Sequence, residues 1–218
     1  MKKTTTILCL GIALCMLGCS DDDDQVTTTS TVPFSLTASL SPRSSDAEDT
    51  GILQGNWDAN SQLAVIKTGS SGVPKSILTR KTDSSDTFTG NLSTLVKNEN
   101  EIAVFYPAAA ITANSSDTLT QTLNLSGQDG TLAGITNYDY LWAQCKAGMN
   151  ETTGSSACEM TSLVTIGKFQ FTVNGGSPLN NITRITITAT AGTLYSSAVM
   201  KLKNGAFSST QTGHITIK

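Results

Sequence analysis

The segment at residues 32–40 constrains the fold of this chain more than any other. Its apolar side chains alternate strictly with small or polar ones, so an extended chain carries one fully apolar face. This face is formed by Val32, Phe34, Leu36, Ala38 and Leu40. We therefore predict a β-strand here. Because Pro33 has no backbone N–H to donate, it belongs near the end of a strand or on an edge strand, and we predict that this strand is peripheral in its sheet.

Further segments are rich in β-branched or alternating residues, and turns of Gly, Asn and Ser separate them. No part of the chain shows a helical period of any length. The predicted strands cover residues 63–67, 76–80, 101–106, 119–125, 138–145, 160–173, 182–190, 199–203 and 215–217. Many short strands of this kind predict an all-β fold, an antiparallel Greek-key-type β-sandwich over residues 32–218.

The N-terminus predicts export and a lipid anchor. Two lysines precede an apolar run at residues 7–17, which is too short to cross a bilayer core of about 30 Å. Cys19 follows a glycine at the end of this run and resembles the cysteine of a bacterial lipobox, which is acylated and begins the mature protein. We predict a signal peptide over residues 1–18 and palmitate on Cys19. The alternative is that Cys19 is one more cysteine of the signal.

Four aspartates follow Cys19 after a single serine. This run resembles the export tag that sends Bacteroidota lipoproteins to the outer face of the outer membrane, which predicts a cell-surface location. The other interpretation is a solvated tether whose like charges repel one another. Residues 21–31 hold almost no large apolar side chain, so we predict a flexible tether over residues 19–31.

Composition excludes several classes of partner and chemistry. Charged residues make up 14% of the chain, against about 25% in an average soluble protein, which is typical of a β-rich surface protein. The net charge of -3 and the lack of a long basic run argue against a nucleic-acid partner. With one histidine and no GxSxG or HExxH motif, we expect no enzyme, no metal site and no cofactor. Two of five scattered acids could still meet in the fold as a catalytic carboxylate pair, although such acids are usually solvated individually. These are Asp58, Asp117, Asp129, Asp139 and Glu159.

The segment at residues 41–56 is polar and rich in structure breakers over most of its length, which predicts an exposed loop. The chain has three arginines, of which Arg184 lies in a predicted strand and Arg80 beside another. Arg43 is therefore the best-placed site for an arginine-specific protease. The alternative is an ordinary solvated loop charge.

Two cysteines remain after the signal, Cys145 at the end of one predicted strand and Cys158 at the beginning of the next. A hairpin brings such residues within bonding distance, and an exported protein meets an oxidising compartment. We predict a disulfide, worth about 3 kcal/mol in the chain-entropy model. Two free buried thiols and a metal site are the alternatives.

Four aromatic residues occupy or precede predicted strands: Trp57, Trp142, Tyr138 and Tyr140. They suit either a sugar-stacking platform or the core, and large aromatics at strand positions favour the core.

These motifs, in this order, resemble the fimbrillin family of Bacteroidota surface lipoproteins, at the N-terminal domain. The acidic-tagged lipobox, the early alternating strand, the arginine-bearing loop and Trp57 ahead of a strand come first. Three later segments match the family as well: 102–108 (IAVFYPA) its strand ending in Tyr-Pro, 138–143 (YDYLWA) its Asp-Tyr-Leu segment, and 163–173 with 182–190 its paired strands. Family members usually continue into a second β-sandwich, so we expect a fragment or an N-terminal domain alone. The alternative is a short member that cannot polymerise in the usual way.

The resemblance implies a structural subunit of surface fimbriae that assembles by donor-strand exchange. It implies lipid on Cys19, a cut at Arg43 by an arginine-specific protease, and a first strand whose five apolar side chains plug a groove. A neighbouring subunit then fills that groove with its own strand. The implied partners are other fimbrial subunits, the outer membrane before the cut, and a host or bacterial receptor. Two alternatives stay open: a surface glycan-binding lipoprotein, and an anchor subunit that is never cut.

Overall fold

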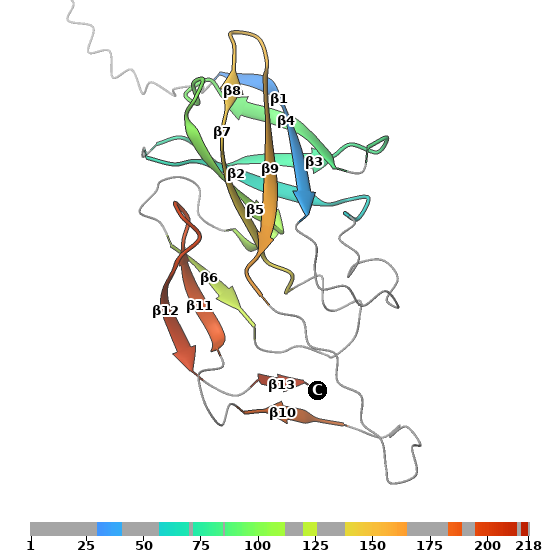
Figure 1. Ribbon diagram of the computed structural model, residues 1–218, viewed down its shortest axis with the longest axis vertical. Helices are drawn as coiled ribbons and strands as arrows, with labels where there is room; N and C mark the ends of the chain where they lie inside the picture. The colour runs from blue at the N-terminus through green and yellow to red at the C-terminus, as the bar shows by residue number, and fades with distance from the viewer. Residues whose placement is uncertain are drawn as a thin grey trace, which may run out of the picture.

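The computed structural model describes residues 30–40, 57–69, 72–84, 86–111, 120–125, 138–164, 183–188, 195–212 and 215–217 (Figure 1). In these residues the elements are β1 (Thr31–Leu40), β2 (Gln62–Lys67), β3 (Ser76–Arg80), β4 (Thr87–Ser93), β5 (Glu101–Tyr106), the 3-10 helix η2 (Ala108–Ala110), β6 (Thr120–Asn124), β7 (Leu141–Lys146), β8 (Gly148–Met149), β9 (Gly154–Ser162), β10 (Ile185–Ile187), β11 (Tyr195–Lys201), β12 (Phe207–Thr212) and β13 (Ile215–Ile217). The predicted all-β class is confirmed. Across the described ranges we find no helix long and apolar enough to span a membrane.

The main sheet closes on itself. Its strands follow the order β1, β4, β3, β2, β5, β7 and β9, and β9 then pairs with β1. The closing pair is parallel, whereas the others in this ring are antiparallel. This closed, barrel-like arrangement does not confirm the predicted Greek-key sandwich. The sequence could not distinguish the two, because alternation within a strand indicates which face is buried and not which strands lie beside it.

Strand β1 is not at the edge of its sheet, which corrects the prediction made from Pro33. It pairs with β4 from Thr31 to Thr37 and with β9 from Phe34 to Leu40. Pro33 lies one residue before the β9 ladder begins, so only β4 is paired with it. The proline is tolerated because this end of the strand has a single laddered neighbour.

Two apolar clusters fill the molecule. The first lies inside the barrel and draws side chains from each of the seven strands of the ring. The second lies between the outer face of β2 and β5 and a smaller sheet of β6, β11 and β12, which sits below the barrel in Figure 1. Alternate residues of β5 serve both clusters, with Val104 facing inward and Phe105 outward. This explains why β2 and β5 are continuous apolar runs rather than alternating ones.

The predicted strand bounds match the structure at β3, β5 and β13 and differ by a few residues at β1, β2, β6, β7, β10 and β11. Three strands, β4, β8 and β12, were not predicted. Strand β9 begins at Gly154, six residues before the predicted segment 160–173, of which residues 165–173 lie outside the described residues.

Candidate functional site

The candidate site is the groove that β1 occupies. Four of the five predicted plug residues are buried: Val32 is 8% exposed, Phe34 2%, and Leu36 and Ala38 0%. Leu40 is partly buried and packs against the same inner cluster. The residues between them face outward or are only half-buried. The sequence therefore identified the inward face of β1 correctly. Cys19 and Arg43 lie outside the described residues.

The two walls of the groove are β4 and β9. On β9 the residues opposite the plug are small at one end and grow along the strand: Gly154 faces Phe34, Ser156 faces Leu36, Cys158 faces Ala38 and Met160 faces Leu40. The side chains of β1 thus fill space that β9 leaves empty. This complementarity of size is a feature that the sequence analysis missed, since nothing in β9 alone indicates which strand lies beside it.

Phe34 has a glycine opposite it on each wall, Gly90 on β4 and Gly154 on β9. A Cβ atom at Gly154 would lie 2.6 Å from Cδ2 of Phe34 and 2.3 Å from Sδ of Met149. A Cβ at Gly90 would lie 2.6 Å from the carbonyl oxygen of Ile77 and 2.8 Å from Cδ2 of Leu78. A larger residue at Gly154 would meet the Phe34 ring itself, whereas one at Gly90 would meet β3, so it is Gly154 that leaves room for an aromatic ring at this position.

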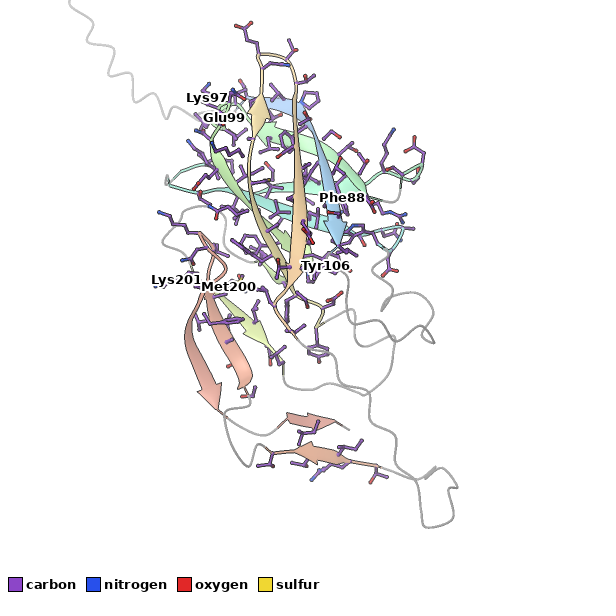
Figure 2. All side chains as sticks on the ribbon, viewed as in Figure 1. Phe88, Lys97, Glu99, Tyr106, Met200 and Lys201 are labelled. Carbon is purple, nitrogen blue, oxygen red and sulfur yellow. The ribbon has the colours of Figure 1, made fainter. Side chains whose placement is uncertain are left out.

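Trp57 fastens the far end of β1. Its indole Nε1 donates a buried hydrogen bond of 2.7 Å to the carbonyl oxygen of Ala38. Its ring meets those of Phe88 and Tyr106 edge-on, with centroids 5.0 and 5.2 Å away. Figure 2 marks both of these residues near the C-terminal end of β1. Trp57 is thus a core residue, as predicted, and it also holds the backbone of the plug strand.

Backbone and side-chain bonds outside the ladders tie β1 at both ends. The amide of Ala38 donates to the carbonyl oxygen of Asp86 at 2.9 Å. At the other end, the amide of Thr94 donates to the carbonyl oxygen of Ser30 at 2.8 Å. The hydroxyl of Ser39 donates to the carbonyl oxygen of Cys158 at 3.3 Å. All of these bonds involve the main chain of β1 or of its flanking residues, or a small hydroxyl, so another strand of similar sequence could form them.

We expect Trp57→Phe to weaken retention of β1 by about 1–3 kcal/mol, because a buried hydrogen bond is lost with part of the ring volume. The measurement is the rate at which β1 dissociates after the connecting loop is cut. Trp142→Phe is the matched control, since the Trp142 side chain packs in the outer cluster rather than inside the barrel, with Nε1 3.5 Å from the carbonyl oxygen of Leu202. Equal rates in the two variants would contradict a fastening role for Trp57.

The other predicted aromatics do not form a platform. The hydroxyl of Tyr140 donates to the carbonyl oxygen of Asn124 at 3.1 Å, and burial raises the pKa of this tyrosine. Gly205 covers the ring of Trp142 so closely that a Cβ there would lie 2.7 Å from Cδ2 of that ring. Tyr138 is half-buried. The core interpretation is confirmed for Trp57 and Tyr140, and the described residues contain no sugar-stacking surface made by all four.

The predicted acids do not gather either. Asp58 and Glu159 are exposed and Asp139 is buried, while Asp117 and Asp129 lie outside the described residues. In the part of the chain that the structure describes, no three His, Cys, Asp or Glu residues are placed to hold a metal ion.

The predicted disulfide is not present, and both Cys145 and Cys158 are free, half-buried thiols. They pack against the same inner cluster from β7 and β9. Their side chains hydrogen-bond to one another, and this bond lowers the pKa of Cys145 to about 7 although burial opposes the shift. The same bond, together with burial, raises the pKa of Cys158. The structure brings the two cysteines together without joining them.

Comparison with known proteins extends only to the fold. No protein-family model matches the sequence. No curated protein matches it either. A crystal structure of a candidate cell adhesion protein from Bacteroides ovatus is similar, with a TM-score of 0.52, 15% sequence identity, and a match that covers 86% of this chain and 72% of that one. At this identity the likeness shows a shared fold.

Proposed function

We propose that this chain is a structural subunit of surface fimbriae whose β1 is exchanged for the strand of a neighbouring subunit. The observation that carries the proposal is the dual character of β1. It is buried like a core strand, but it precedes the rest of the barrel in the chain, and only the connection at residues 41–56 joins its C-terminal end to that barrel. One cut in that connection would leave β1 held by non-covalent contacts alone.

The energetics of exchange favour a coupled process. Apolar burial stabilises β1 by about 25 cal/mol per Å² of area removed from water, so cutting alone would not eject it. Removal would expose the ladder edges of both β4 and β9 along with the inner cluster, a surface prone to aggregation. A second strand with the same pattern would restore the same contacts, so exchange costs little at equilibrium. Cutting and filling are therefore expected to occur together.

The structure also constrains the incoming strand. β1 runs antiparallel to β4 and parallel to β9, and its register with both is fixed over seven residue pairs each. A replacement must run in the same direction and place its large residues on alternate positions, as strand addition to a sheet requires. A one-residue slip would turn its polar side chains into the barrel.

The remaining parts of the proposal rest on the resemblance. Palmitate on Cys19 and the acidic run after it would hold the precursor at the outer membrane surface, and a cut at Arg43 by an arginine-specific protease would release it into a fimbrium. The Bacteroides ovatus structure belongs to a candidate cell adhesion protein, which supports an adhesive role at the cell surface. A host or bacterial receptor would then be the partner.

Digestion of the folded chain with an arginine-specific protease tests the processing step. We expect the first cut at Arg43 and co-purification of β1 afterwards. Arg80 is half-buried in β3, but Arg184 is exposed just ahead of β10 rather than inside it, which corrects the prediction and makes it a competing site. The experiment therefore uses Arg184→Lys, with Arg43→Lys added as the control. Cleavage at Arg80 while Arg43 stays intact would contradict the proposed processing.

A further inference from the structure

The seam between β7 and β9 is interrupted in its middle. Backbone pairing joins Leu141 to Ser162 and Trp142 to Thr161 at one end. At the other end β8 continues the line of β7 and pairs Gly148 with Ser155. Between these described ends no ladder pair joins β7 to β9. This seam is thus weaker than the one between β5 and β7, which is paired along its whole length.

Cys145 and Cys158 lie opposite each other in this interruption. The two ends of the seam keep one register, and that register places these two residues face to face. Both side chains point into the barrel and contact its inner cluster. A neighbouring side chain also spans the gap, because the hydroxyl of Ser156 donates to the carbonyl oxygen of Lys146 at 2.7 Å and lies 3.3 Å from Sγ of Cys145.

The two thiols are chemically distinct. The hydrogen bond from the Cys158 thiol lowers the pKa of Cys145, so Cys145 is the sulfur of the pair that ionises more readily. The same hydrogen bond, together with burial, raises the pKa of Cys158. Cys145 is therefore the attacking sulfur in exchange with an external disulfide, and Cys158 is the resolving one.

We propose that Cys145 and Cys158, which are free thiols in this structure, can be oxidised to a cross-strand disulfide that closes the interrupted seam and keeps β9 on the barrel while β1 is being exchanged. The oxidant is an external disulfide, such as oxidised glutathione or the active disulfide of a thiol oxidase. The Cys145 thiolate attacks one sulfur of this disulfide, forms a mixed disulfide with it and releases the other sulfur as a thiolate. Cys158 then loses its proton, attacks Sγ of Cys145 and releases the second thiolate. Two thiols are oxidised and one external disulfide is reduced to two thiols.

The second half of this inference rests on the proposed strand exchange. β9 is paired with β1 over residues 154–160, so it loses that neighbour when β1 leaves. What then holds β9 is the β8 hairpin at one end and two residue pairs with β7 at the other. Cys158 of β9 faces Ala38 of β1 on one side and Cys145 of β7 on the other. A bond between the two sulfurs would therefore hold β9 to β7 beside the groove that β1 occupies.

The first experiment asks whether the bond forms. The full chain with Cys9, Cys15 and Cys19 replaced by alanine is folded, treated with reduced or oxidised glutathione, alkylated and weighed intact. We expect two alkylated thiols in the reduced protein and none in the oxidised one. The oxidised protein should unfold at a temperature roughly 6–12 °C higher. The same chain with Cys145→Ser and Cys158→Ser should show no redox dependence. Two thiols that persist in oxidised glutathione, or a bond without a rise in unfolding temperature, would overturn the proposal.

The second experiment asks what the bond does. In a chain with a protease site inserted between residues 41 and 56, β1 is cut and competed away with excess peptide of residues 31–40 while amide hydrogen exchange in β9 is followed. We expect β9 to exchange at least tenfold faster in the reduced than in the oxidised protein. Equal rates during exchange of β1 would overturn the role assigned to the bond. If β1 never exchanges, the proposed function fails, and the first experiment still decides the disulfide.

Discussion

Leu36→Asp is expected to prevent the chain from folding into its native barrel, or to destabilise it by about 4 kcal/mol or more. Leu36 is completely buried between Phe88 of β4 and Ser156 of β9. The substitution removes a large apolar side chain, which alone costs about 2–5 kcal/mol. It also places a carboxylate among apolar residues, where a charge has no compensating partner. Unfolding in denaturant, followed by tryptophan fluorescence, measures the loss.

Thr37→Asp is the matched control for this variant. Thr37 is the next residue, is exposed, and carries its side chain on the outer face of the same strand. A charge there remains solvated, so its effect should stay within about 0.5 kcal/mol. If Thr37→Asp were as damaging as Leu36→Asp, β1 would be sensitive to a charge on either face. That result would contradict the interpretation of Leu36 as an inward-facing plug residue.

The second large effect is expected at the aromatic position of the groove. Phe34→Ala should cost about 3–5 kcal/mol, because a ring that is 2% exposed leaves a cavity. Gly154→Ala should cost about 1–3 kcal/mol by overpacking, since its Cβ would lie 2.6 Å from Cδ2 of Phe34. Both values come from chemical denaturation of the full chain.

The double variant tests whether these two residues form one contact. In Phe34→Leu/Gly154→Ala the smaller side chain removes the clash with the Phe34 ring and leaves only the one with Sδ of Met149, which belongs to a flexible side chain, so the combined loss should be smaller than the sum of the single losses. Thr89→Ala supplies a control, because Thr89 is exposed on β4 beside Gly90. It should add independently to Phe34→Leu. Simple additivity of Phe34→Leu with Gly154→Ala would mean that the glycine does not shape the groove.

The sequence predicted best those strands whose own residues report their burial. β1 alternates because it is buried on one face, and β5 is a continuous apolar run because it is buried on both. Strand β4 was missed since Gly90-Asn91 in its middle looks like a turn, although Gly90 is there to avoid Leu78. The first half of β9 was missed for a related reason: its inner residues are small to accommodate β1.

The partners of each strand could not be predicted in the same way. Pro33 indicates a missing N–H, but whether that makes a strand peripheral depends on where each neighbouring ladder begins. The parallel pairing of β1 with β9 joins segments more than a hundred residues apart, and no local pattern encodes it. Cys145 and Cys158 face each other because of the register of β7 with β9. The cysteine spacing predicted a hairpin that brings the two residues close, but it could not predict this register.

The central claim is that β1 is a replaceable strand, and exchange in trans tests it most directly. A lipid-free chain, with Cys19→Ala and a protease site inserted between residues 41 and 56, is cut and incubated with an isotopically heavy peptide of residues 31–40. Native mass spectrometry then follows the replacement of the light strand by the heavy one. A peptide of the same composition with its apolar residues moved to the opposite positions is the control.

We predict progressive replacement by the native peptide, none by the control peptide, and a folded barrel throughout. Failure of the heavy strand to enter while the cut protein stays folded would contradict the account. So would loss of β1 from a barrel that remains folded with its groove empty.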